Sequence, residues 1–276
     1  MHAQSEAALA PRAGDADAFY DLRADGRIHS NRATIGPWSP AWQHGGPPAA
    51  LLALNLEALG GVRGARIARM TFDFLGPVPV ADLTVTTEVV RPGARIQLSS
   101  AALRTADRMV LQATAWHVLA ESGRSAAVPH TFVAPPIPVE ETRSSFPGVG
   151  SFPYAEALEW RFVTGGFDEL GPATVWTRCR IPVLRGVPLT GLQRVLVMVD
   201  AANGISASLP ILTWSFVPID LTVVLERHPD EEWVGMSAVT TIGTDGIGFT
   251  DTILFDARGL IGRALQTLFV APRAAP

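Results

Sequence analysis

The chain has 276 residues, of which 47% are hydrophobic and 17% are charged. This composition is sufficient to bury one large core or two modest ones, which excludes disorder as the main state. With 22 basic and 26 acidic residues, the formal net charge is −4. The chain therefore has no global positive field to attract nucleic acid or anionic lipid, and we expect no nucleic-acid partner.

All the basic residues are arginines, and the absence of lysine excludes Schiff-base chemistry, lysine general bases and the P-loop lysine. The single cysteine, Cys179, cannot form an internal disulfide or a multi-cysteine metal site, which fits a reducing compartment. Residues 1–14 do not resemble a signal peptide, and no segment is apolar enough to span a bilayer. We therefore expect a cytoplasmic protein without membrane insertion, and without a metal or other cofactor.

The first half of the chain, residues 15–125, begins with a strand region over residues 19–34. A helix is predicted over residues 47–60, because Pro47 and Pro48 stand at its start and Gly60 at its end. This helix is apolar nearly all round, so it must be buried on most sides, as it would be inside a curved sheet. Alternating apolar and polar residues then predict four strands, over residues 66–75, 82–90, 95–103 and 109–119.

A proline-rich linker is expected over residues 126–153, and the second half, residues 154–276, repeats the order of elements. Its helix is predicted over residues 189–202. Its strands are predicted over residues 158–163, 174–183, 219–226, 233–241, 248–255 and 259–270. A central helix wrapped by an antiparallel sheet, twice in tandem, is an α+β double hotdog, and the repeated order supports duplication.

Several motifs resemble the thioesterase-like superfamily, which is related to acyl-CoA thioesterase II. They are GPWSPAWQHGGPPAALL over residues 36–52, DAANG over 200–204, DLTV over 220–223 and GRALQTL over 262–268. The resemblance covers nearly the whole chain. It implies a double-hotdog enzyme of lipid metabolism that hydrolyses acyl-CoA. Such hydrolysis needs donors for the carbonyl oxygen and an acid–base group, but no strong nucleophile.

Two glycines, Gly45 and Gly46, directly precede the first helix. Their N–H groups could approach a substrate oxygen at the positive end of the helix dipole, which predicts an oxyanion hole. The alternative is a tight strand-to-helix turn that needs glycine. Because Pro47 and Pro48 remove the next two N–H donors, His44 is a candidate substrate-binding side chain, with a turn or capping role as its alternative.

Asp200 follows an apolar run near the end of the second helix, where burial and the helix dipole would raise its pKa. From the residues alone, a general base and a helix-ending residue are both open. The resemblance matches Asp200 to the family's catalytic aspartate. It also matches Gln266, otherwise a structural bridge, to the glutamine that orients water.

One position departs from the family pattern. Pro218 stands where the resemblance places a threonine, two residues before Asp220. A replacement hydroxyl could come from Thr222, Ser215 or Thr213. Thr222 is included among the candidate catalytic residues. Asp220 is included as a substrate-binding candidate, with a charge on the outer sheet surface as its alternative.

The two halves are expected to form one composite site. Ala115 occupies the position of Gln266 in the first half, and the second helix begins with the single glycine Gly191. Neither half therefore holds both donor and base. The alternatives are a non-catalytic acyl-CoA or acyl-chain binding protein, suggested by Pro218, and a hotdog enoyl-CoA hydratase using Asp200 with His44. Exposed sheet faces leave a homodimer possible.

Overall fold

A computed structural model describes residues 17–59, 63–126, 128, 130–142 and 145–273 of the chain. The first half contains β1 (Tyr20–Leu22), β2 (Ile28–Ser30), the 3-10 helix η1 (Arg32–Thr34), α1 (Gly46–Ala58), β3 (Ala65–Phe74), β4 (Asp82–Arg91), β5 (Ile96–Arg104) and β6 (Met109–Leu119). The second half begins with α2 (Pro153–Glu156), β7 (Leu158–Thr164), β8 (Ala173–Cys179), α3 (Gly191–Val199) and α4 (Ala202–Ile205). It ends with β9 (Trp214–Pro218), β10 (Asp220–Leu225), β11 (Trp233–Ile242), β12 (Ile247–Asp256) and β13 (Gly259–Pro272).

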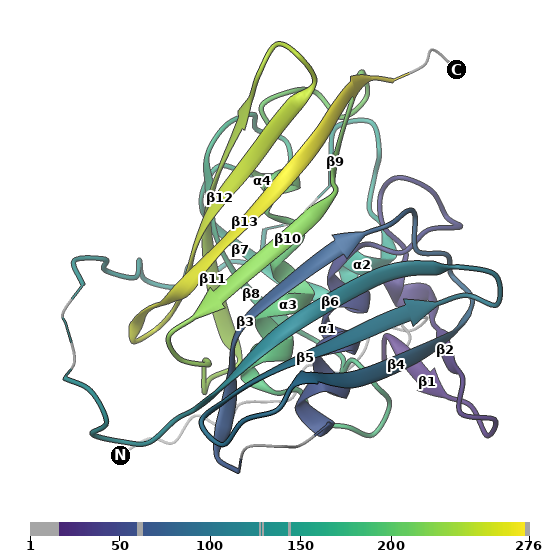
Figure 1. The fold of residues 1–276 in the computed structure, drawn as a ribbon. Helices are drawn as coiled ribbons and strands as arrows, with labels where there is room; N and C mark the ends of the chain where they lie inside the picture. Colours follow the sequence, from purple (N-terminus) through teal and green to yellow (C-terminus); the bar gives the residue numbers. More distant parts are fainter. Residues whose placement is uncertain (1–16, 60–62, 127, 129, 143–144, 274–276) are drawn as a thin grey trace, which may run out of the picture.

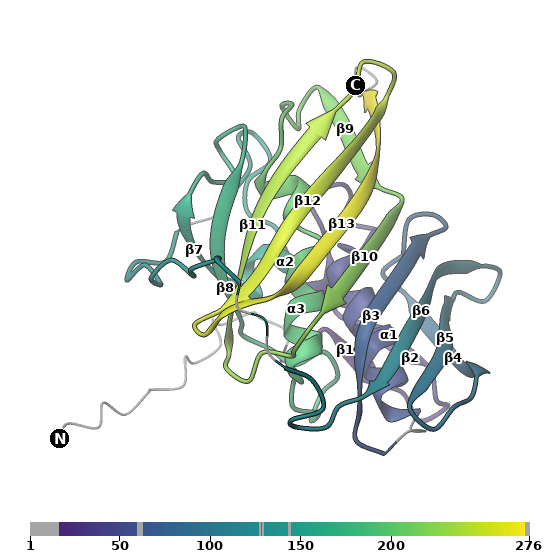
Figure 2. The same ribbon diagram turned by 60° about the vertical axis from the view of Figure 1, so that its left-hand side comes forward.

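The strands form one sheet that runs through both halves. Their order is β1-β2-β4-β5-β6-β3-β10-β13-β12-β11-β8-β7, and β9 pairs with β13. The two halves join where β3 pairs antiparallel with β10, so that Thr222 lies opposite Thr71. Figures 1 and 2 show this sheet curving around α1 and α3. The predicted α+β double hotdog is therefore confirmed.

The two central helices pack closely against each other at the start of α1. A Cβ atom on Gly46 would lie 2.0 Å from the carbonyl oxygen of Val197 on α3, a separation that real Cβ atoms do not adopt. Glycine is thus required here for a close backbone approach rather than for an unusual dihedral angle. Because the sheet and α3 surround it, α1 is buried on most sides, including Leu51, Leu52 and Leu56.

The structure corrects the sequence prediction at three points. The helix predicted over residues 189–202 is divided, because α3 ends at Val199 and α4 follows as a separate short helix. The strand predicted over residues 174–183 ends at Cys179. The third correction is β9, a strand that was not predicted. It has only five residues and ends in Pro218, which has no N–H for strand pairing.

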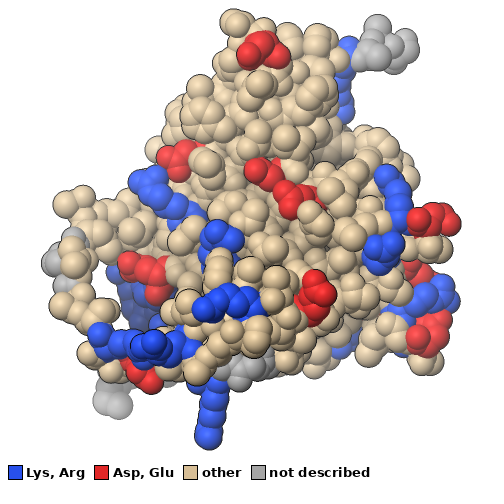
Figure 3. Space-filling view, viewed as in Figure 1, with Lys and Arg blue, Asp and Glu red and all other residues tan. Residues whose placement is uncertain are grey.

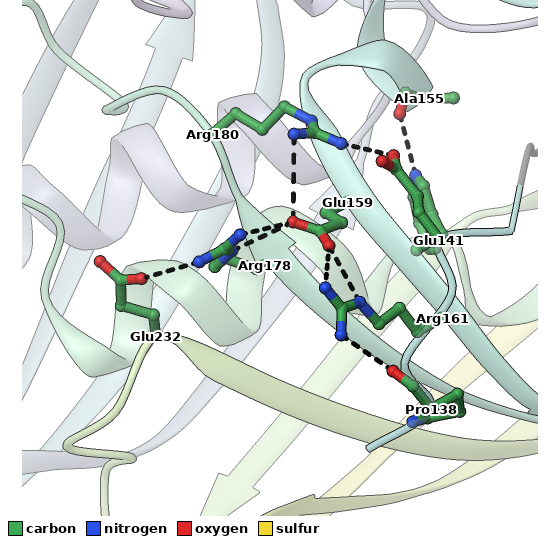
Figure 4. A network of polar contacts seen from close by, with 9 residues as sticks. Pro138, Glu141, Ala155, Glu159, Arg161, Arg178, Arg180 and Glu232 are labelled. Carbon is green, nitrogen blue, oxygen red and sulfur yellow. Dashed lines mark hydrogen bonds and ion pairs between the residues drawn. The ribbon is translucent and has the colours of Figure 1, made fainter. Parts of the chain in front are cut away.

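An ionic network holds the segment between the halves against β7 and β8 (Figure 4). The side chain of Glu159 on β7 is only 3% exposed and pairs with Arg161 and Arg178. Burial acts to raise the pKa of Glu159, but hydrogen bonds from Arg178 and Arg161 outweigh it and hold this pKa below its usual value. Arg161 also donates to the carbonyl oxygen of Pro138, which fastens the linker to the sheet.

The outer face of the second half is poor in charge. Figure 3 shows few blue or red atoms over β12 and β13. Apolar side chains are exposed there instead, among them Phe249 on β12 and Leu265 and Phe269 on β13. Within the described ranges, no helix combines the length and apolar character needed to cross a bilayer.

Candidate active site

A cavity of about 380 Å³ lies where the start of α1 meets the end of α3. His44 and Gly45 line it from the first half, and Asp200 and Asn203 line it from the second. Much of the remaining wall is aromatic or aliphatic. The part of the chain that the structure describes contains no group of three or more His, Cys, Asp or Glu side chains arranged to hold a metal ion.

Asp200 and His44 meet across the two halves. Nδ1 of His44 lies 3.2 Å from Oδ2 of Asp200, and the two side chains are 11% and 6% exposed. Asp200 is positioned as the C-cap residue of α3, while His44 directly precedes the N-cap Gly45 of α1. The packing of the two helices therefore brings together residues that are far apart in the sequence.

Burial favours the neutral form of both groups, which is the protonated carboxyl group of Asp200 and the deprotonated imidazole of His44. Desolvation raises the pKa of Asp200 to about 7, although hydrogen bonds from the Gly45 N–H and from Gln266 oppose this shift. Burial lowers the pKa of His44 to about 3, so the imidazole is neutral at pH 7 and the contact is not an ion pair. Asp200 is therefore the member of the pair that changes protonation state near neutral pH.

The position of the imidazole proton follows from the contact with Gly46. The Gly46 N–H donates to Nδ1 of His44 at 3.2 Å, so the proton of the neutral ring is on Nε2. In this tautomer, Nδ1 can also accept a hydrogen bond from Asp200, but only when the carboxyl group is protonated. The ring of Tyr154 stacks on His44 with a centroid separation of 3.7 Å and holds it in place.

Both glycine N–H groups of the predicted oxyanion hole have partners within the site. The Gly45 N–H bonds to Asp200, and the Gly46 N–H bonds to His44. A Cβ on Gly45 would lie 2.6 Å from Oδ2 of Asp200, so glycine is what allows the carboxyl group to approach. To bind a thioester oxygen, one of these N–H groups must exchange its partner. The predicted oxyanion hole remains a prediction.

Gln266 lies behind Asp200 rather than in the cavity. Its Nε2 donates to the backbone oxygen of Asp200 at 3.2 Å and to Oδ1 at 3.4 Å. Its Oε1 accepts from the backbone N–H of Asn203 at 3.2 Å. Gln266 is 1% exposed. These contacts correspond to the structural bridge that the sequence left open, and they hold Asp200 in position.

The structure does not bring Thr222 and Asp220 to the cavity. Thr222 lies on the outer face of β10, opposite in direction to the buried Leu221 and Val223, and its hydroxyl is 3.1 Å from that of Thr71. Asp220 is on the same outer face, where it accepts a hydrogen bond from the Thr267 N–H at 2.7 Å. The cavity wall therefore gives no support to their expected catalytic and substrate-binding roles.

Among the three hydroxyls considered for the position lost at Pro218, Ser215 is the one that lines the cavity, as does Pro218 itself. Thr213 instead donates to the carbonyl oxygen of Pro210. Sequence reasoning missed Tyr154, which follows Pro153 at the end of the linker. No periodic pattern or spacing could have indicated its contact with His44.

Two central helices wrapped by one antiparallel sheet define a double-hotdog protein. In this chain a buried carboxyl group lies where the two helices meet. The Acyl-CoA thioesterase N-terminal domain family matches residues 34–118, and the Acyl-CoA thioesterase C-terminal domain family matches residues 133–270. The second match spans half of the chain and the first precedes it in the expected order. The chain therefore belongs to the acyl-CoA thioesterase family of double-hotdog enzymes.

Solved structures agree on the fold. A putative thioesterase II from Thermobifida fusca superposes with a TM-score of 0.70 at 14% identity, over 93% of this chain and 98% of that chain. A hot dog protein of unknown function from Alicyclobacillus acidocaldarius gives 0.70 at 18% identity, over 92% and 96%. An acyl-CoA thioesterase II from Mycobacterium marinum gives 0.64 at 16% identity, over 84% and 91%. No curated protein sequence matches the chain significantly.

Proposed function

We propose that the enzyme hydrolyses acyl-CoA thioesters to free acid and CoA at one composite site between its two halves. The observation that carries this proposal is the meeting of Asp200 with Gly45 and His44 in the wall of the cavity. A carboxyl group with a pKa of about 7 beside a helix N-terminus combines a base with a positive dipole. Those are the two functions that thioester hydrolysis requires.

Asp200 acts as the general base. Its carboxylate takes a proton from a water molecule while the water oxygen attacks the thioester carbonyl carbon. When the carbon–sulfur bond breaks, the sulfur leaves as a thiolate and receives the proton from Asp200, so that free acid and thiol are formed. Gln266 is a positioning residue in this scheme, because it fixes Asp200 from behind.

The start of α1 stabilises the negative charge that develops on the carbonyl oxygen. The Gly46 N–H exchanges its bond to His44 for one to this oxygen, aided by the positive end of the helix dipole. Ser215, which lines the cavity, holds the attacking water in place of the threonine lost at Pro218. This assignment replaces the expectation for Thr222.

The exposure of the cavity lining gives the direction in which the substrate enters. We define the mouth of the cavity by its exposed residues Trp42 and Ile219, which are 44% and 49% exposed. Arg273 also lines the cavity, and its guanidinium lies 5.1 Å from the ring centroid of Trp38. The hydrophilic, phosphorylated CoA extends out of the mouth past Arg273, and the acyl group points inward.

The decisive experiment measures free CoA released from a panel of acyl-CoAs, with ligand binding measured in parallel. We expect CoA release without an added cofactor. Tight binding without CoA release would favour the acyl-CoA binding protein instead. Hydration of crotonyl-CoA without CoA release would favour the enoyl-CoA hydratase.

Three broader expectations remain predictions. Light scattering after size-exclusion chromatography tests the homodimer, for which the apolar outer face of β12 and β13 is available. Fractionation of the native cells tests the cytoplasmic location. A change in the acyl-CoA pool after deletion of the gene tests the role in lipid metabolism.

A further inference from the structure

We infer that the enzyme acts on compact acyl groups, of the size of octanoyl or phenylacetyl, rather than on long fatty acyl chains, and that Phe146 and Gly204 set this limit. The inference rests on the proposed function, because it concerns the acyl end of the same cavity. Three observations carry it: the size of the cavity, the residues that close its inner end, and a glycine that packs closely against one of them.

The cavity is small for what it must hold. Its volume of about 380 Å³ includes the region around Asp200 and the approach from Trp42. This is near the lower end of the range of about 300–1,000 Å³ found for small-molecule pockets. Because the thioester and the adjoining end of the CoA arm occupy part of this space, only the remainder is free for the acyl group.

An aromatic cluster closes the inner end, which we call the floor and define by Phe146, Phe152 and Phe167. These residues line the cavity but are only 5%, 6% and 7% exposed, in contrast to Trp42 at the mouth. The ring of Phe146 lies edge-on to Phe167 at 5.0 Å and stacks with Phe152 at 6.1 Å. Aromatic rings that pack against one another in this way resist displacement, so a long acyl chain cannot extend past the floor.

Gly204 connects the catalytic group to this floor. It lies four residues after Asp200, in the short helix α4, and it also lines the cavity. A Cβ on Gly204 would lie 3.2 Å from Cζ of Phe146. Any side chain at this position would therefore press on the ring of Phe146 and narrow the cavity beside the floor.

The test compares kcat/KM for hexanoyl-, octanoyl-, phenylacetyl- and palmitoyl-CoA in the wild type, Phe146→Ala and Gly204→Leu. In the wild type we expect octanoyl-CoA and phenylacetyl-CoA to exceed palmitoyl-CoA at least tenfold. Phe146→Ala should raise the ratio of kcat/KM for palmitoyl-CoA to that for octanoyl-CoA about tenfold or more. The reason is that each methylene accommodated in an apolar pocket changes kcat/KM by about 10–200-fold. Gly204→Leu should lower octanoyl turnover more than hexanoyl turnover.

Phe162→Ala is the matched control. Phe162 contacts Phe167 edge-on at 5.5 Å but does not line the cavity, so its removal should leave the substrate ratios unchanged. If Phe146→Ala does not fold, Phe146→Leu takes its place with the same expected direction.

A wild-type preference for palmitoyl-CoA, or equal effects of Phe146→Ala on all substrates, would overturn the inference while leaving the proposed hydrolysis intact. Absence of turnover on every substrate would overturn the proposed function. Calorimetric binding of octanoyl-CoA and palmitoyl-CoA would then still test the floor, because stronger binding of palmitoyl-CoA would contradict it.

Discussion

Oε2 of Glu57, near the end of α1, lies 2.7 Å from Nε2 of Gln193 in the first turn of α3. The same oxygen accepts a hydrogen bond from the hydroxyl of Thr190, the N-cap residue of α3. The other end of the helix pair has the same arrangement, because Asp200 at the end of α3 accepts a hydrogen bond from Gly45 at the start of α1. Each helix thus receives a carboxyl group from its partner. This reciprocity expresses the pseudo-twofold relation between the halves, and the Asp200 end opens into the cavity described above.

Replacing Glu57 should affect stability and leave catalysis intact. Glu57→Ala removes the acceptor of two hydrogen bonds at the start of α3, and a typical intramolecular hydrogen bond contributes about 0.5–1.5 kcal/mol net. We expect the free energy of unfolding, measured in urea, to fall by about 1–3 kcal/mol, with kcat unchanged. Glu88→Ala, at an exposed position on β4, is the control. Equal free energies of unfolding for the two variants would show that the contact between the helices does not stabilise the protein.

Asp200→Asn should affect catalysis strongly. Loss of a general base typically costs 10²–10⁴-fold, and we expect kcat to fall by that amount in a folded protein. In the wild type, kcat/KM should rise with pH and level off above a midpoint near 7, because the base acts in its ionised form and its pKa is about 7. Asp220→Asn on the outer face is the matched control. Near-normal turnover by Asp200→Asn would require a base elsewhere.

The same carboxyl group should make stability depend on pH. Its pKa of about 7 in the folded protein exceeds the ordinary value of 3.8, so the folded state binds the proton more tightly than the unfolded state does. This contribution is fully present below about pH 4 and is lost as the pH rises to about 7.

Asn has no titratable group, so the stability of Asp200→Asn does not change with pH through this residue. The free energy of unfolding of the variant minus that of the wild type should therefore increase between pH 4 and pH 7 and stay constant above pH 7. Urea unfolding at several pH values measures the difference. A difference that is independent of pH would mean that Asp200 is already ionised in the folded protein at low pH.

Gly46→Ala should destabilise the protein, because its Cβ would lie 2.0 Å from a backbone oxygen of α3 that cannot move without the helix. We expect a lower melting temperature together with a lower kcat, since the N–H of residue 46 would be displaced. Gly191→Ala is the comparison: its Cβ would lie 2.1 Å from the Pro229 oxygen, away from the cavity. It should reduce stability but not kcat. A drop in kcat from Gly191→Ala of the same size would remove the distinction between helix packing and catalysis.

Arg273 should contribute to recognition of the carrier rather than of the acyl group. Of the described residues that line the cavity, Arg273 alone has a permanent positive charge, and acyl-CoA carries several phosphate charges. Arg273→Gln should raise KM for octanoyl-CoA several-fold and leave kcat unchanged. The control substrate is the octanoyl thioester of N-acetylcysteamine, which lacks phosphate, and its KM should not change. An equal rise for both substrates would place the role of Arg273 at the acyl end.

The sequence by itself determined the order of the main elements. Alternation along residues 66–75 and the apolar character of residues 47–60 reflect local geometry, because a strand half buried in a sheet and a helix enclosed by one each impose their own pattern. For Asp200, the residues alone left a general base and a helix-ending residue open, and only the family resemblance favoured the catalytic role.

Only the tertiary structure decided which side chains share the cavity. The face on which Thr222 lies depends on how β10 pairs with β3, a strand some 150 residues earlier, and a shift of one residue would reverse it. The bridge from Gln266 to Asp200, the stacking of Tyr154 on His44 and the floor at Phe146 likewise join distant segments. Periodicity reports only on neighbours along the chain, so contacts of this kind exist only once the helices and the sheet have packed.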